Sequence, residues 1–362
     1  MRIWHVNVGN HAGRVDGVAV IAGQLARDQA DLGHDVRLVV DLTPRDALRL
    51  LADPAARPDV VHLHSVFRPV HRVLGWRAQR LGVPVVLSPH SGLAPALLRR
   101  DRTRKWLYGS LLERRFHRRA DGVHALQLVE RDDVLRYCGR SRSVAVIPNP
   151  VDAALLIADP WSPPTPTATT TGRPRAVLLC RYDVYQKGLD RVEALAHRLP
   201  GVDFRVYGHA DRNAPERAAA LIERAPANLR FEPPVHGDDK LAVLRGADVF
   251  LQPSRVEGLS VALVEAMTLG VPCAVSGYVG RSLDLDRLGT ALVLDDRPEP
   301  AAAQLATLLD DRDRRARLGA TARTYARQEF DPVTVARRHV EHYARLVPAF
   351  AQPDGRPRAT FG

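Results

Sequence analysis

The stretch VFLQPSRVEGLSVALVEAMTLGVPCAVSG, residues 249 to 277, is typical of a strand, a loop, a helix and a second strand. Its two short apolar runs enclose a longer apolar segment that follows Gly258 and Ser260, residues suited to start a helix. Strand, crossover helix and strand in this order indicate a parallel sheet. Two carboxylates, Glu257 and Glu265, flank residues that are suited to burial, which suggests that these acids do more than pack.

The same alternation of short apolar runs and helical stretches continues through the chain, and it predicts parallel sheets with helices on both faces. We therefore expect an α/β fold with two doubly wound, Rossmann-like domains that face each other across a cleft at the carboxyl ends of their strands. Strands are predicted at residues 3–8, 36–40, 59–64, 84–88, 122–126 and 144–148, and again at 176–180, 204–208, 229–233, 249–253 and 273–277.

Length and composition agree with two domains. The chain has 362 residues, 45% of them hydrophobic and 26% charged, and a domain averages about 150 residues. We place the first domain at 1–158, a Pro/Thr-rich linker at 159–174 and the second domain at 175–331. The sequence opens as a strand without the ~7–15-residue apolar region of a signal peptide, so a cytoplasmic location is expected. The cysteines, which suggest a reducing compartment and a packing role, are Cys138, Cys180 and Cys273.

The net charge of +11 invites a search for an anionic partner. Only three of the 52 cationic residues are lysine, so the arginine excess can reflect coding bias as well as partner choice. Residues 97–121 interleave arginine with apolar side chains at helical spacing. This block is read as a solvated helix face or, alternatively, as a peripheral contact with an anionic membrane. Nucleic acid is not expected as a partner, because no binding motif accompanies the charge.

Chemistry is expected in the loops that follow strands of the second domain. After the run AVLLC comes RYDVYQKGLD, in which Arg181 and Lys187 flank a loop that ends at Gly188 and opens a helix. Two cations beside a glycine and a helix start suit a diphosphate, because amide donors, the helix dipole and side-chain charge all favour an anion. The alternative is a surface turn with incidental cations.

A second loop supports the first interpretation. Gly258 and Ser260 can begin a helix whose amides face the same anion. Glu265, inside that helix, can take both hydroxyls of a ribose in a bidentate contact, and Glu257, just before it, can meet a sugar hydroxyl. The alternative is that both acids simply occupy exposed helix positions.

These stretches together resemble the retaining glycosyltransferases of family 4, also called group 1 glycosyltransferases, which have the two-domain GT-B fold. The resemblance covers most of the chain. Its most specific part is the pattern of an acid, seven residues and an acid in EGLSVALVEAM, and it extends to LGVPCAVS, RYDVYQKGLD, IPNPVD and SPHSGL. It implies transfer of a hexose-type sugar from a nucleotide diphosphate sugar, with UDP preferred, to an acceptor hydroxyl with retained configuration.

The resemblance also implies a role for each matching residue. Arg181 and Lys187 would neutralise the leaving diphosphate, Glu257 would contact the donor sugar and Glu265 would hold the nucleotide ribose. The amides of Gly258, Leu259 and Ser260 would complete the phosphate cradle.

The amino-terminal domain contributes two further matches. His90, in the loop after the strand at 84–88, matches the family histidine that lies near the donor sugar. Gly17 in GRVDGVA matches the glycine-rich first loop, where the backbone approaches the phosphates and the acceptor. The segment 332–350 matches the carboxy-terminal helix that crosses back to the first domain.

The expected leaving group needs no metal cofactor in this interpretation. Arg181, Lys187 and helix amides can stabilise the diphosphate electrostatically, and one well-placed donor can contribute ~3–4 kcal/mol to catalysis. The resemblance implies front-face attack by the acceptor rather than a double displacement, although the Glu257 carboxylate is chemically able to act as a nucleophile.

Two other motifs suggest metal binding only weakly. Asp284 and Asp286 form an acid pair beyond the expected phosphate loops. His62 and His64 share one strand face, but no third ligand is apparent in the sequence, so we interpret them as cleft wall or packing.

Some positions depart from the family pattern. Cys180 replaces the glycine that usually precedes the loop arginine, and Asp16 stands where a second glycine is common. The acid often found after CAVSGYVG is not obvious. Contacts to the donor sugar are therefore less well defined by the sequence than contacts to the diphosphate.

Three functions remain open at this stage. The first is a sugar transferase acting on a glycan or lipid-linked glycan near the membrane, and the second is the same chemistry on a soluble natural product or aminocyclitol. The third, of another class, is a non-catalytic nucleotide-binding protein on the same fold. The sequence does not specify the sugar, the nucleotide base, the acceptor or the oligomeric state.

Overall fold

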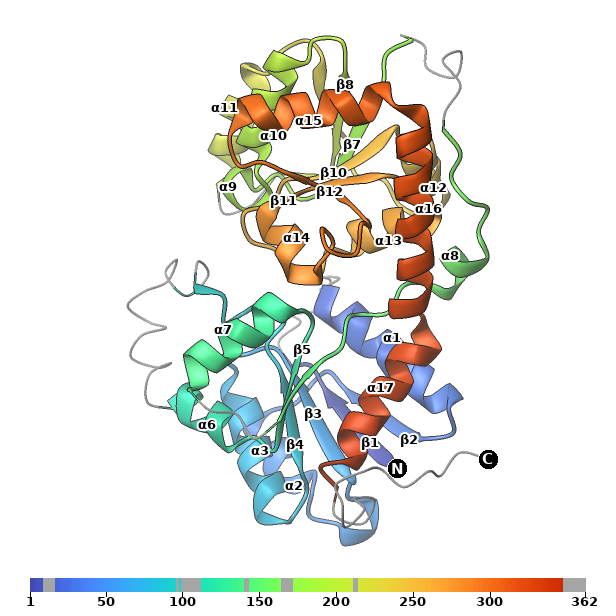
Figure 1. Cartoon of the computed structure of the whole chain (residues 1–362). Coiled ribbons are helices and arrows are strands. Elements are labelled where there is room, and N and C mark those ends of the chain that lie inside the picture. Colours follow the sequence, from blue (N-terminus) through green and yellow to red (C-terminus); the bar gives the residue numbers. More distant parts are fainter. Residues whose placement is uncertain are drawn as a thin grey trace. The chain divides into compact units, whose positions relative to one another are not determined.

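The computed structural model describes residues 1–8, 17–95, 98, 112–139, 143–163, 172–210 and 214–347. It divides into two compact units, residues Met1–Pro150 with Pro332–Gly362 and residues Val151–Asp331. Each unit holds a parallel sheet of six described strands with helices around it (Figure 1). The predicted α/β fold is confirmed, and each predicted strand lies within two residues of an observed one.

The first sheet has the strand order β2-β1-β3-β4-β5-β6. Its strands are β1 (Arg2–Val6), β2 (Asp35–Val39), β3 (Val60–His64), β4 (Val85–Ser88), β5 (Gly122–Ala125) and β6 (Val144–Val146). The helices of this unit are α1 (Gly17–Asp31), α2 (Pro44–Arg49), η1 (Pro54–Ala56), α3 (Pro69–Arg80), α6 (Arg114–Arg119), α7 (Leu128–Cys138) and α17 (Pro332–Ala344).

The second sheet has the strand order β12-β11-β10-β7-β8-β9. Its strands are β7 (Arg175–Leu179), β8 (Asp203–Tyr207), β9 (Leu229–Glu232), β10 (Val249–Gln252), β11 (Cys273–Ser276) and β12 (Leu292–Leu294), the last of which the sequence pattern missed. The helices are α8 (Ala153–Ile157), α9 (Val184–Lys187), α10 (Leu189–Arg198), α11 (Pro215–Glu223), α12 (Gly237–Arg245), α13 (Val261–Leu269), α14 (Gly277–Leu283), α15 (Pro298–Asp310) and α16 (Arg312–Glu329).

Alternation along the strands gives the first sheet two different faces. Trp4, Val61 and Leu63 belong to the core on one face, whereas Ile3 and Val60 pack with Val340 and Tyr343 of α17 on the other. Helix α17 comes from the end of the chain and lies beside α1 (Figure 1). The carboxy-terminal helix expected at 332–350 therefore belongs to the first unit.

The boundary between the units differs from the expected one. The second unit begins at Val151 rather than at 175, and the expected linker is partly packed. The Val151 amide donates to the Phe330 carbonyl at 2.9 Å. Trp161 is 8% exposed, and its indole nitrogen donates to the Ala247 carbonyl at 2.8 Å. A single large aromatic side chain thus anchors a segment whose Pro/Thr content predicts an exposed linker.

Candidate active site

The second sheet reverses its strand order between β7 and β10. From β7 the chain proceeds outward through β8 and β9, then resumes at β10 on the opposite side of β7. The loops that follow these two neighbouring strands diverge at this point, where open α/β sheets bind their ligands. The loops contain Arg181, Lys187 and residues 257 to 260, so the fold places these predicted residues at one edge of the sheet.

The loop after β7 is built around a short helix and a glycine. Asp183 caps α9, its carboxylate accepting from the Gln186 amide at 2.9 Å. Gly188 joins α9 to α10 in the left-handed conformation, with φ +68°. A β-carbon there would lie 2.3 Å from the Pro253 carbonyl oxygen. Only glycine therefore lets the two loops approach each other so closely.

Lys187 and Glu257 form an ion pair between the two loops. The Lys187 Nζ lies 2.5 Å from the Glu257 Oε2. The Gln252 amide and the Ser254 hydroxyl donate to the same oxygen at 3.1 Å each. Glu257 is only 9% exposed. Three donors on one carboxylate oxygen fix the acid in place and compensate its burial.

Arg181 is the more exposed cation of the loop. Its guanidinium lies 3.4 Å from the Gln186 side-chain oxygen and 3.9 Å from the Asp183 carboxylate. The preceding residue, Cys180, departs from the family glycine. Burial raises the pKa of the Cys180 thiol to about 12, against the opposing charge of Lys187. The thiol therefore stays protonated and packs under the loop rather than reacting.

Helix α13 begins at the same edge. The Ser260 hydroxyl caps it by accepting from the Leu263 amide at 3.4 Å, and the same hydroxyl donates to the Gln252 side-chain oxygen at 3.0 Å. Leu259 is buried, and Gly258 is partly exposed. Residues 258 to 260 therefore lead directly into the amino terminus of α13, where the helix dipole and the first-turn amides favour an anion.

Glu265 lies one turn inside α13 and is 6% exposed. Its Oε1 accepts from the Lys240 Nζ of α12 at 2.6 Å. Burial raises the pKa of Glu265, whereas the bond to Lys240 and its charge lower it. The expected bidentate ribose contact would share this carboxylate with Lys240. Two of the three lysines in the chain thus pair with the two glutamates of EGLSVALVEAM.

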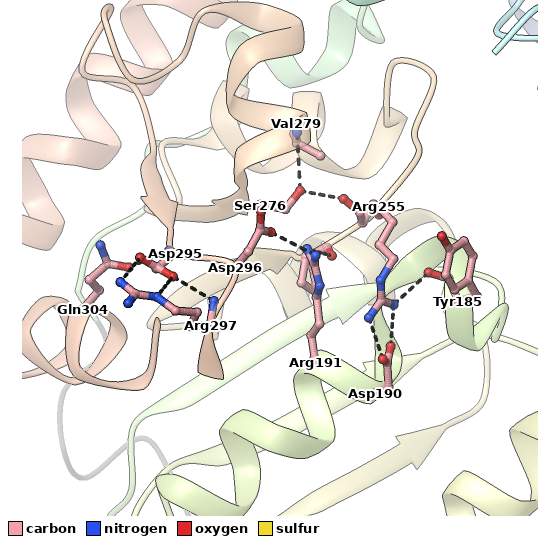
Figure 2. A network of polar contacts seen from close by, with 12 residues as sticks. Tyr185, Asp190, Arg191, Arg255, Ser276, Val279, Asp295, Asp296, Arg297 and Gln304 are labelled. Carbon is pink, nitrogen blue, oxygen red and sulfur yellow. Dashed lines mark hydrogen bonds and ion pairs between the residues drawn. The ribbon is translucent and has the colours of Figure 1, made fainter. Parts of the chain in front are cut away.

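A polar network fastens the loop after β10 to the surrounding helices (Figure 2). Arg255 holds the Asp190 carboxylate through two bonds of 2.7 and 2.6 Å and donates to the Tyr185 carbonyl at 3.1 Å. The Ser276 hydroxyl donates to the Ser254 carbonyl at 2.6 Å. These contacts brace the loop from α9, α10 and the end of β11, so Glu257 is presented on a rigid support.

His90, the predicted site residue after β4, lies in a strained loop of the first unit. His90 and Ser91 both have positive φ, 49° and 63°. The Ser91 amide donates to the Glu130 Oε1, and the Leu126 amide donates to the Glu130 Oε2 at 2.7 Å. Burial raises the pKa of Glu130 to about 7. Consecutive non-glycine residues in this region are typical of functional sites, where neighbouring contacts compensate the strain.

Gly17 begins α1, and a β-carbon added there would meet no atom within 4 Å. The chain itself therefore does not require glycine at this position. The rest of the glycine-rich first loop, residues 9–16 including Asp16, lies outside the described residues. So does most of the basic block at 97–121, of which residues 98 and 112–121 are described. Across the described residues no helix is long and apolar enough to cross a membrane.

The two weak metal motifs fare differently. Asp284 ends α14 and pairs with Arg287 at 2.5 Å, which is a structural role. His62 and His64 do gain a third histidine, because β1 places His5 beside them, with ring nitrogens of all three within 4.8 Å. The sequence pattern did not predict this neighbour, because His5 is nearly sixty residues away in the chain.

Sequence reasoning missed several residues of this region. Lys240 stands in the first turn of α12 with no recognisable motif, and its only signal was the scarcity of lysine in the chain. Gln252 lies inside a strand run, and Glu130 is a buried carboxylate within a helix. Lys240 and Glu130 act through partners 25 and 39 residues away in the chain. The partners of Gln252 are only two to eight residues away, but no motif marks a strand glutamine that turns toward the loop after its own strand.

Comparison with known proteins places this geometry in a family. Residues 41–155 match the model of Glycosyltransferase Family 4, and residues 171–325 match that of Glycosyl transferases group 1. The chain is 30% identical to the D-inositol 3-phosphate glycosyltransferase of Xylanimonas cellulosilytica over 296 residues. This match covers 75% of this chain and 68% of that protein. It is 27% identical over 369 residues to the glycogen synthase of Mycobacterium tuberculosis, covering 94% and 83%.

A solved structure agrees with the fold. The Anabaena protein HepE in complex with UDP and glucose superposes with a TM-score of 0.71 at 17% identity, covering 94% of this chain and 99% of HepE. The two parallel α/β sheets and the family matches together define a GT-B glycosyltransferase. The chain belongs to the group 1 glycosyltransferases, as its motifs predicted.

Proposed function

We propose that this enzyme transfers a hexose-type sugar from a UDP-sugar to a hydroxyl of a glycan or lipid-linked glycan, with retention and without a metal ion. The observation that carries the proposal is the convergence of Arg181, Lys187 and the start of α13 at the switch point between β7 and β10. Two cations and a helix amino terminus form a site for a diphosphate. HepE, a structure of the same fold, is in complex with UDP.

The roles of the two acids follow from their contacts. Glu265, buried beside Lys240, is positioned to accept ribose hydroxyls, and Glu257 is positioned to meet the sugar. Because the Glu257 Oε2 already accepts from Lys187, Gln252 and Ser254, the nucleophilicity of that oxygen is reduced. This supports direct front-face transfer rather than a covalent intermediate.

In that step the bond between the anomeric carbon and the diphosphate oxygen breaks. A bond from the acceptor oxygen to the same face of the anomeric carbon forms, and the acceptor proton passes to the departing phosphate. Arg181 and Lys187 stabilise the charge that develops on the leaving diphosphate. No nucleophile of the enzyme and no metal ion is required for this balance.

The first test is thermal unfolding with UDP, GDP, ADP and TDP and their sugar conjugates, each with and without chelator. A nucleotide at ~100 times its dissociation constant adds ~2.7 kcal/mol to the free energy of unfolding. We expect UDP to stabilise the wild type regardless of chelator, and Lys187→Ala and Glu265→Ala to lose the response. Absence of any shift with every nucleotide contradicts the donor site, and a shift that chelator abolishes contradicts metal independence.

A second acceptor class is a small soluble polyol or natural product. The relative from Xylanimonas cellulosilytica, named for D-inositol 3-phosphate, favours it, whereas the relative named glycogen synthase favours a glycan. Transfer assays with the donor found above, offered α-glucan, inositol phosphate and lipid-linked glycan separately, decide between them. NMR of the anomeric proton in the product tests retention, and flotation with anionic vesicles tests contact between the basic block and a membrane.

A further inference from the structure

One face of the first sheet changes character along its strands. At the amino-terminal ends, Ile3, Val60 and Val86 form an apolar cluster with α17. Two residues further along, the same face carries His5, His62 and Ser88, and then His64, because alternate strand residues point the same way. All of these polar side chains are at most 1% exposed. The buried polar face lies at the reversal of strand order between β1 and β3.

The histidines of this face are neutral, and so are His90 beside His64 and His124 beside His62. Burial is the largest cause for each, lowering the pKa of His5 and His90 to about 4 and the pKa of His124 to about 3. The pKa values of His62 and His64 are lowered well below 6.5 by burial and by neighbouring histidines. A neutral imidazole has one N–H donor and one acceptor nitrogen, so every bond in the cluster has a direction.

One chain of bonds has its direction fixed by a backbone carbonyl. The His124 Nε2 lies 2.7 Å from the Ile147 carbonyl oxygen, which can only accept. His124 Nδ1 must then accept from the Ser88 hydroxyl, at 2.5 Å. Ser88 in turn accepts from the His62 Nε2, and His62 Nδ1 accepts from the Tyr343 phenol at 2.6 Å.

A second chain starts at Gln29 of α1 and ends at the strained loop. The Gln29 Oε1 is 2.8 Å from the His5 Nε2, the His5 Nδ1 is 2.9 Å from the His64 Nε2, and the His64 Nδ1 is 3.0 Å from the His90 Nε2. If the Gln29 oxygen accepts, each ring donates from Nε2 toward Gln29. His90 then carries its proton on Nε2 and leaves Nδ1 unprotonated.

The structure places the Gln29 amide with its oxygen toward His5. The Gln29 Oε1 is the atom that lies 2.8 Å from the His5 Nε2, and among the described residues the Gln29 Nε2 is buried without a hydrogen-bond partner. A neutral imidazole nitrogen that faces an acceptor oxygen carries the proton. The direction of the second chain therefore follows from the contact between Gln29 and His5.

We propose that Gln29, His5 and His64 form a relay that sets the tautomer of His90, so that the His90 Nδ1 accepts a hydrogen bond from a sugar hydroxyl. Gln29, His5 and His64 are positioning residues, because they reach the substrate only through His90. Among the described residues the His90 Nδ1 makes no hydrogen bond, which leaves this acceptor available. The hydroxyl partner rests on the proposed function, whereas the tautomer does not.

A metal centre is the competing interpretation of the same histidines. A divalent ion would need lone pairs from His5, His62 and His64, but both nitrogens of each of these rings already take part in hydrogen bonds. No carboxylate of the described residues joins the group, so two positive charges would be buried without compensation. The relay satisfies every one of these nitrogens without added charge.

The test is the tautomer of His90, read from long-range 15N–1H correlation spectra of histidine-labelled protein without substrate. Wild type is expected to show His90 protonated on Nε2. His64→Leu removes the acceptor and should give mixed tautomers, whereas His64→Asn places an oxygen near the former Nδ1 and should preserve the Nε2–H form. Gln29→Met, two rings away, should also mix the tautomers of His90.

His71→Leu serves as the matched control, because it removes a buried histidine of the same unit that lies outside both chains. Its His90 spectrum should equal that of the wild type. The relay is overturned if wild-type His90 carries its proton on Nδ1, or if neither His64→Leu nor Gln29→Met alters it. Stoichiometric Zn²⁺ binding that His64→Leu abolishes would also overturn it, in favour of a metal centre.

Kinetics then separate the relay from the function. With the donor and acceptor identified above, His64→Leu should lower kcat/KM roughly tenfold, and His64→Asn should recover most of the loss, since one hydrogen bond to substrate is at stake. If the spectra agree but no transfer occurs, the proposed function fails and the relay stands. If the wild type transfers sugar but neither His64→Leu nor Gln29→Met alters the tautomer of His90, the relay is wrong and the proposed function stands.

Discussion

At the scale of single residues, the site consists of acids matched with scarce lysines. Lys187 and Glu257 are mostly buried, and each compensates the charge of the other. Removing one partner therefore leaves an uncompensated charge, which is costly whatever the function. Loss of activity in a single variant would not distinguish a structural role from a catalytic one, but a paired substitution does.

We predict that Lys187→Met lowers the free energy of unfolding by about 1–3 kcal/mol, because Glu257 is left buried without its cation. The double variant Lys187→Met with Glu257→Gln should recover most of this stability. It should still fail to bind the nucleotide, because the cation remains absent. Urea unfolding with and without UDP measures both quantities. Recovery of UDP binding in the double variant would contradict a role for Lys187 at the diphosphate.

At the scale of elements, two loops after neighbouring strands make the site because their backbones can touch. Gly188 permits this approach, and the bonds from Arg255 to Asp190 and from Ser276 to Ser254 hold it (Figure 2). In the first unit, Glu130 performs a similar task for the loop that carries His90. Buried polar side chains thus substitute for secondary structure in holding the functional loops.

Gly188→Ala should destabilise the protein by about 2–4 kcal/mol, from the positive φ and from the clash with the Pro253 carbonyl. Gly237→Ala is the matched control, because Gly237 also has positive φ, +51°, but a β-carbon there meets no atom within 4 Å. Gly237→Ala should lower the free energy of unfolding by only about 1 kcal/mol and leave UDP binding unaltered. Thermal unfolding of both variants with and without UDP checks this, and equal losses would show that the close approach of the loops is unimportant.

At the scale of the whole molecule, the two units differ in buried ionisable groups. Every histidine whose pKa is clearly lowered belongs to the first unit. A buried neutral histidine titrates at lower pH in the folded state than in the unfolded state. Protons therefore bind preferentially to the unfolded chain as the pH falls.

We predict that the first unit loses stability as the pH falls from about 6.5 to about 4. The pKa values of His5, His71, His90 and His342 lie at about 4 when folded, so each costs about 3 kcal/mol once the pH reaches 4. The pKa of Glu130 is raised to about 7, so its contribution to stability has the opposite sign and is lost as the pH rises from 4.5 to 7. This single contribution is smaller than the combined effect of the histidines.

Hydrogen exchange resolved by peptide, at pH 7 and pH 5 and corrected for intrinsic rates, tests this prediction. Amides of β1, β3 and β4 should lose protection at pH 5 before those of β7 and β10 do. In His71→Leu the number of protons taken up on unfolding, read from the slope of the free energy of unfolding against pH, should fall by about one. Equal protection of the first unit at both pH values would contradict it.

Local sequence patterns determined the strands, the order of the elements and the loops that carry Arg181, Lys187 and EGLSVALVEAM, because alternation of apolar residues and helix-start residues acts over short stretches. They missed β12, which is only three residues long, and placed the domain boundary late because Trp161 packs against a distant carbonyl.

Tertiary structure alone decided the partners. The pairing of Glu265 with Lys240, the pairing of Glu257 with Lys187 and the joining of His5 to His64 and His90 all link residues that are 25 or more positions apart, a separation that carries no signal of contact. A buried charge or imidazole must find a partner in space, and only the folded sheet order specifies which one it meets.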